Sequence, residues 1–144
     1  MKTLNMEKLV QAYCEGLDAL GLKHEGKEER LNGVAVRFTD GNGKFLLIFD
    51  KEDPGFVTVL FPNFYPIETE EEYVNCLMAA TKATGVLKSS KIMVDLEEKQ
   101  VSVSAEFFDY SIEEKGQLLK RYIGAVESGI HEFLKVLRTG GSSD

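Results

Sequence analysis

The sequence has little of what marks disordered, secreted or membrane-spanning chains. It contains only three prolines and no low-complexity tract, which argues against disorder. No uninterrupted apolar run is longer than Phe45 to Phe49, and a run of that length does not cross a bilayer. The start, MKTLNMEKLV, is too polar for a signal peptide. These features predict a soluble protein, and 144 residues are the size of one domain.

Basic residues are also in the minority. Seventeen Lys and Arg stand against 24 Asp and Glu, which gives a formal net charge of −7. A phosphate backbone or an anionic membrane surface is bound mainly through clustered cations, and the basic residues here form no run. We therefore expect neither nucleic acid nor a membrane as a partner, whereas the acidic balance suits a basic partner segment.

The sequence shows no spacing typical of a metal site. Cys14 and Cys76 each lie in a helical pattern without a second cysteine nearby, which predicts reduced thiols in a cytoplasmic protein. The histidines, His24 and His131, have no partner at the short spacing that zinc sites show. No metal or other cofactor is expected.

Catalytic motifs are equally scarce. The glycines of Asp40-Gly41-Asn42-Gly43 precede a strand, whereas a phosphate-binding loop precedes a helix, so we interpret this segment as a hairpin turn. A nucleophile needs a base that a third group orients, and the sequence offers no such set. The paired acids fall at expected helix starts or hairpin tips, where acids serve capping and solvation. We therefore expect that the protein is not an enzyme.

Apolar periodicity predicts the order α-β-β-β-α-β-β-α. The first helix runs from Met6 to Leu20, and capping boxes predict two more helices that begin at Thr69 and at Ser111, the last running to about Leu137. The polar residues 23–32 fit either a loop or an irregular edge strand. The predicted fold is one α+β domain over residues 1–139, with an antiparallel sheet packed against helices and a disordered tail over residues 140–144. Strands are expected over Val34–Phe38, Phe45–Phe49, Phe56–Phe61, Ile92–Leu96 and Val101–Phe107.

The last predicted helix carries a heptad pattern of apolar residues from Leu119 onward. One interpretation is that these residues cover the sheet. The helix is longer than a small sheet needs, however, and charged residues flank the apolar ones, which favours pairing with a second subunit as well. The predicted homodimer interface consists of Ile123, Ile130, Phe133 and Leu137.

The segment Phe61-Pro62-Asn63-Phe64-Tyr65-Pro66 combines aromatic rings and prolines in one short connection. It fits a loop that covers the core, or a rigid apolar rim that binds a peptide or a partner protein. The predicted partner-binding residues are Phe61, Phe64, Tyr65, Phe107 and Phe108.

At the level of its elements, the chain resembles the type III secretion chaperone-like fold and, within it, the YbjN-type domains of bacteria. The resemblance covers about residues 4–138. It rests on the strand-turn-strand Val34 to Phe49 with its Asp40-Gly41 tip, the helix after the proline segment, and the last two strands before the long helix. It implies an α+β sandwich that is commonly a homodimer, and secretion chaperones of this fold bind an extended client segment without catalysis. No binding residue is carried over by motif.

These observations favour a non-enzymatic, chaperone-like or regulatory module that binds a segment of an unknown partner protein. The alternative is a small-molecule-binding or enzymatic α+β domain with a pocket between the sheet and the last helix. A third possibility is an accessory domain that assembles with a single partner.

Overall fold

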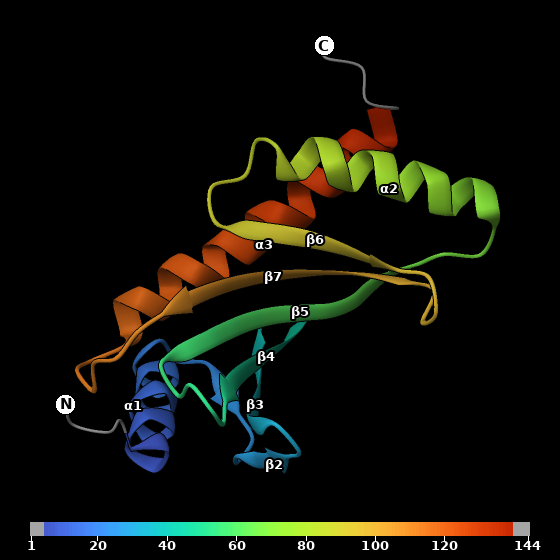
Figure 1. The fold of residues 1–144 in the computed structure, drawn as a ribbon. Helices are drawn as coiled ribbons and strands as arrows, with labels where there is room; N and C mark the ends of the chain where they lie inside the picture. Colours follow the sequence, from blue (N-terminus) through green and yellow to red (C-terminus); the bar gives the residue numbers. More distant parts are fainter. Residues whose placement is uncertain (1–4, 140–144) are drawn as a thin grey trace.

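The computed structural model describes residues 5–139, which form an antiparallel sheet of seven strands and three helices (Figure 1). This confirms the predicted α+β class. The helices are α1 (Met6–Ala19), α2 (Glu70–Thr84) and α3 (Gly116–Thr139). The strands are β1 (Lys23–His24), β2 (Glu28–Arg30), β3 (Gly33–Asp40), β4 (Gly43–Asp50), β5 (Phe56–Pro66), β6 (Ser90–Asp95) and β7 (Gln100–Phe108).

The polar segment 23–32 contributes two short strands at one edge of the sheet. β1 pairs with the end of β3 and β2 pairs with its start, so the observed order in the described chain is α-β-β-β-β-β-α-β-β-α. The sheet order is β1-β3-β4-β5-β7-β6, with β2 also beside β3. Because β5 pairs with β7 and not with β6, β6 lies at the opposite edge.

Helices α1 and α3 pack against one face of the sheet, which we call the covered face (Figure 1). Successive side chains of a strand point to opposite faces, and the covered face receives the larger apolar set. Helix α2 lies beside α3 and β6, where the small residues Ala79, Ala80 and Ala83 allow close packing around Phe133. The main core includes Leu9, Tyr13, Leu17, Val36, Leu47, Phe49, Val57, Val59, Val103, Ala105, Leu119, Ile123 and Val126.

Local signals fix the ends of α1 and α2 as expected. The Asn5 side chain accepts a hydrogen bond from the Lys8 N–H, and Gly21 after α1 takes a left-handed φ of 73°. The Thr69 hydroxyl caps α2 by accepting from the Glu72 N–H at 3.1 Å, and the Glu72 carboxylate accepts from the Glu68 N–H.

Helix α3 begins at Gly116, so the predicted start at Ser111 is wrong. The Ser111 hydroxyl accepts from the Glu113 N–H, and the Glu114 carboxylate accepts from the Gly116 N–H. A capping box would instead pair the Ser111 hydroxyl with the Glu114 N–H and the Glu114 carboxylate with the Ser111 N–H. The Lys115 ammonium donates a hydrogen bond to the Ser111 carbonyl oxygen at 2.7 Å. These bonds hold residues 109–115 as an irregular connection between β7 and α3.

The aromatic segment 61–66 is the end of β5 and not a separate loop. Asn63 adopts a left-handed φ of 53°, and the pairing of β5 with β7 shifts register between Phe61 and Tyr65. The Asn63 N–H donates to the Ser102 hydroxyl at 2.9 Å, which fixes this bulge against β7. Strand alternation already points Phe61 to the covered face, and the bulge lets the Phe64 ring turn inward beside it.

Two further observations concern the limits of the described chain. No helix within residues 5–139 is long and apolar enough to cross a membrane. The tail over residues 140–144, expected to be disordered, lies outside the described residues.

Candidate binding surface

The second face of the sheet, which we call the open face, points away from α1 and α3. The register places Arg37, Leu46, Leu60 and Ser104 in one row across β3, β4, β5 and β7. The next row contains Ile48, Thr58 and Glu106, also on this face. Leu46, Ile48 and Leu60 are half-buried, and they lie outside the apolar cluster that α1 and α3 build on the covered face. They form an apolar strip that the helices of residues 5–139 leave outside the core.

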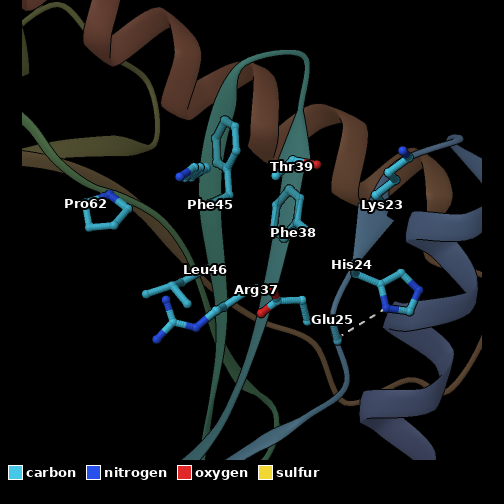
Figure 2. Close-up of a pocket in the computed structure, with 10 residues that line it drawn as sticks. Lys23, His24, Glu25, Arg37, Phe38, Thr39, Phe45, Leu46 and Pro62 are labelled. Carbon is cyan, nitrogen blue, oxygen red and sulfur yellow. Dashed lines mark hydrogen bonds between the residues drawn. The ribbon is translucent and has the colours of Figure 1, made fainter.

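A hollow of about 480 Å³ lies at one end of the strip (Figure 2). Figure 2 shows the Leu46 and Arg37 side chains pointing toward the side on which Pro62 lies. Arg37 is held by the Glu28 carboxylate, which accepts from its Nε at 3.2 Å. The hollow is lined by Lys23, His24, Glu25, Arg37, Phe38, Thr39, Lys44, Phe45, Leu46 and Pro62.

A second hollow, of about 320 Å³, lies on the other side of the strip. Ile48, Phe56 and Thr58 line it from the sheet, and the turn between β2 and β3 lines it from the edge. Leu31 in that turn is 92% exposed. The strip therefore has a concave site at each end.

Aromatic rings extend this second end of the open face. The Phe56 and Phe108 rings lie 5.3 Å apart, and Phe108 and Tyr110 stack at 6.3 Å. Phe108 is 67% exposed and Tyr110 is 59% exposed. The Tyr110 hydroxyl donates to the Asp53 carboxylate at 3.0 Å, and the ring lies where a Cβ at position 55 would stand. Gly55 thus allows a fixed, exposed aromatic platform.

Only one of the five predicted partner-binding residues lies on this surface. Phe61 packs on Phe45 at 4.9 Å, and both Phe64 and Tyr65 pack on Phe133. Phe107 is buried on the covered face, stacked on Tyr122 at 3.9 Å. Phe108 alone is exposed on the open face.

Sequence reasoning missed Leu46, Ile48 and Leu60. The signal for Leu46 and Ile48 was present in the continuous apolar run Phe45–Phe49, which gives β4 an apolar side chain on both faces. Such a run indicates a strand that is covered on both sides or is central in its sheet, and within residues 5–139 helices α1 and α3 pack on the covered face.

The predicted dimer residues belong mainly to the core of the chain itself. Ile123 packs under the sheet and Phe133 packs against α2, both buried, while Ile130 and Leu137 are half-buried against the same clusters. The heptad pattern of α3 therefore covers the sheet and α2. Exposed apolar residues of the two helices lie elsewhere, at Val74, Leu77 and Met78 of α2 and Leu134 of α3.

A buried ionic cluster links α1 to the connection before α3. The Lys115 ammonium lies 2.7 Å from the Asp109 carboxylate, and the Tyr13 hydroxyl donates to the same oxygen at 2.5 Å. Burial alone would raise the pKa of Asp109, but hydrogen bonds from Lys115, Tyr13 and the Ser111 N–H outweigh it and lower that pKa. Burial and the carboxylate together raise the pKa of Tyr13. The neutral Tyr13 phenol and the Lys115–Asp109 ion pair therefore connect α1 to the segment before α3.

The remaining reactive groups are dispersed. Within the described residues no group of three or more His, Cys, Asp and Glu side chains is placed to hold a metal ion. Cys14 and Cys76 are free thiols, and burial raises the pKa of both, which reduces the thiolate fraction that nucleophilic attack needs. His24 is bonded to the Asp18 carboxylate at 2.8 Å.

Comparison of the chain with protein-family models, with curated proteins and with solved structures gives no match. The resemblance to YbjN-type domains therefore stays a prediction, and the functional argument depends on the residues of the open face.

Proposed function

We propose that this protein is a non-enzymatic binding module that takes a segment of a partner protein on its open face. The observation that carries this proposal is the half-buried apolar strip of Leu46, Ile48 and Leu60, which lies outside the cluster that α1 and α3 build on the other face of the sheet. Burial of apolar area lowers the free energy by about 25 cal/mol per Å², so a complex in which a partner covers the strip is stabilised.

The shape of the open face favours a segment over a large flat partner. The two hollows at the ends of the strip accept protruding side chains, and anchors of this kind carry most of the energy of an interface. The exposed ring of Phe108 adds a third contact at low entropic cost, because an aromatic ring has few rotatable bonds. A partner segment with spaced apolar side chains fits these sites.

Charges around the strip set the direction of the bound segment. Arg37, Lys23 and Lys44 line the first hollow and outnumber the acidic Glu25 there, so they favour an acidic residue of the partner. Farther along the open face, Glu106 forms an ion pair with Lys91 across β7 and β6. Charged rims of this type contribute more to specificity and association rate than to affinity.

We also propose that the protein works as a homodimer in the cytoplasm. The exposed side chains Val74, Leu77 and Met78 follow one face of α2, and Leu134 of α3 is exposed too. Apolar residues at helical spacing on a surface helix are typical of a helix that packs on another helix. Two unpaired cysteines suit a reducing compartment.

The alternative pocket between the sheet and the last helix has little room. Leu119, Ile123 and Val126 of α3 fill that space against Val103 and Ala105 of β7, and all five are buried in one cluster. A partner-binding function is therefore favoured over catalysis in the interior.

Affinity capture from the native cell, read by mass spectrometry, tests the proposal. The test variant is L46T/I48T, which removes apolar area and keeps β propensity. The matched control is L96T/I112T, which removes two exposed apolar side chains that lie outside both the open face and α2. We expect the strip variant to lose proteins that the wild type and the control both retain. Equal recovery by all three forms contradicts the proposal.

A further inference from the structure

A third hollow, which we call the α3 groove, lies between helix α3 and the segment Val86–Ser90 that joins α2 to β6. Its volume is about 890 Å³, which is within the range of sites for small organic ligands. It is lined by Val86, Leu87, Lys88, Ser89, Ser90, Leu118, Lys120, Arg121, Tyr122, Gly124, Ala125 and Ser128.

The charge of the α3 groove is opposite to that of the whole chain. Lys88, Lys120 and Arg121 line it, and none of the described residues that line it is an Asp or Glu. The protein has 24 acidic residues against 17 basic ones, so a wall without acids differs from the rest of the surface. None of these three cations belongs to an ion pair in the described chain. The lining of the groove therefore carries a net positive charge.

The floor of the α3 groove is apolar. Leu118, Tyr122 and Ala125 recur at helical spacing, so they share one face of α3. The Tyr122 ring is stacked on Phe107 with 12° between the ring planes, which fixes its position. Val86 covers the opposite side and is 68% exposed. A floor of this kind accommodates hydrocarbon or an aromatic ring.

Two glycines of α3 shape the α3 groove. A Cβ at position 129 would lie 2.7 Å from Val103 Cγ1 and 3.1 Å from Ser90 Oγ, so Gly129 allows α3 to approach the start of β6. A Cβ at position 124 would meet nothing within 4 Å, so Gly124 leaves open space at the lining.

We propose that the α3 groove binds a small organic anion with an apolar body. Its carboxylate or phosphate group lies among Lys88, Lys120 and Arg121, and its hydrocarbon part lies on Leu118, Tyr122 and Ala125. A guanidinium and two ammonium groups offer several charge-assisted hydrogen bonds to such oxygens. This site is on a different part of the molecule from the open face and does not depend on the function proposed there.

Calorimetric titration of the wild-type protein tests the site, with decanoate and decyl phosphate as probes below their micelle concentrations. Decanol and decyltrimethylammonium have the same chain without a negative charge. We expect at least one anion to bind about tenfold or more tightly than both controls, since the groove supplies charge-assisted bonds. Affinity falls as salt is added. The preferred anion distinguishes a carboxylate ligand from a phosphate ligand.

Variants identify the groove as the place of binding. K120Q/R121Q removes two cations of the lining and weakens binding about tenfold or more. K135Q/R138Q removes two exposed cations of the same helix outside the groove and leaves binding unchanged. Gly124→Leu fills the open space without touching a charge and abolishes binding. Its melting temperature does not fall, because leucine favours a helix over glycine.

Three results overturn the proposal. One is that the decyl anions bind no better than decanol. Another is that the variants place binding outside the groove, because K135Q/R138Q loses as much affinity as K120Q/R121Q or Gly124→Leu binds like the wild type. The third is that the groove takes an acidic peptide while neither decyl anion binds.

Discussion

Lys115 and Asp109 form an ion pair of 2.7 Å in which the lysine is only 2% exposed. The pair stands between β7 and α3, and it reaches α1 through the Tyr13 hydroxyl. Both partners also bond to the backbone around Ser111, so the connection before α3 is fixed by one buried charged cluster.

Breaking this pair is expected to destabilise the fold. Lys115→Met fills similar volume but leaves the Asp109 carboxylate buried without its cation, which costs about 3–5 kcal/mol. Urea unfolding followed by circular dichroism measures the loss. Lys135→Met, which removes an exposed lysine of α3, is the control and changes stability by less than about 0.5 kcal/mol. If the two variants unfold alike, the cluster is not a structural link.

The same cluster predicts an acid-sensitive stability. Because the folded chain lowers the pKa of Asp109, its stabilisation is present above the pKa of an unfolded aspartate, about 3.9. It is lost as the pH falls through the lower folded value. Asp109→Asn is therefore less stable than the wild type at neutral pH, and the difference narrows as the pH falls from about 5 to about 2.

The pH series is read from urea midpoints of both forms. Glu113→Gln removes an exposed acid from the same connection and serves as the control. A stability difference between wild type and Asp109→Asn that stays constant across the acid range contradicts the assignment.

Phe133 distinguishes a core role for α3 from an interface role. The ring is buried and touches the rings of Phe64 and Tyr65, so Phe133→Ala is expected to cost about 3–5 kcal/mol of unfolding free energy. The subunit number of the folded protein should stay the same. Denaturant titration and light scattering measure the two properties separately. A change from dimer to monomer without loss of stability would contradict the core role and would support a dimer interface formed by the heptad residues of α3.

The outer face of α2 is the expected dimer surface. Leu77→Lys places a charge among exposed apolar residues, where it does not disturb the core but opposes close packing of a second helix. Light scattering at high micromolar concentration should show a dimer for the wild type and a monomer for this variant. Lys82→Glu, at the end of the same helix, is the control for a change of charge, and it should remain a dimer. A wild-type monomer removes the dimer proposal.

Much of the fold follows from local patterns. The helical spacing of α1, the cap of α2 by Thr69 and the alternating residues of β7 are each encoded within a few neighbouring residues. The start of α3 could not be predicted in this way. Ser111 and Glu114 carry the sequence of a capping box, but they bond to other backbone N–H groups. The buried Lys115 donates to the Ser111 carbonyl oxygen and pairs with Asp109, a contact between distant parts of the fold that a local pattern does not reveal.

The binding surface was harder to predict because it depends on topology. Aromatic content marked residues 61–66, yet strand alternation places Phe61 on the covered face, and the bulge at Asn63 lets Phe64 and Tyr65 pack on Phe133. The short strands β1 and β2 have no apolar pattern, and they exist because β3 supplies a free edge. The sequence shows that β4 is apolar on both faces, whereas only the structure shows which face stays uncovered.

Photo-crosslinking in the native cell tests the central claim most directly. A photoreactive phenylalanine analogue replaces Phe108 on the open face and, as a control, Glu7 on the exposed side of α1. We expect a covalent adduct with a partner protein from position 108 and none from position 7. Adducts from position 7 alone, or none from position 108, would contradict binding on the open face.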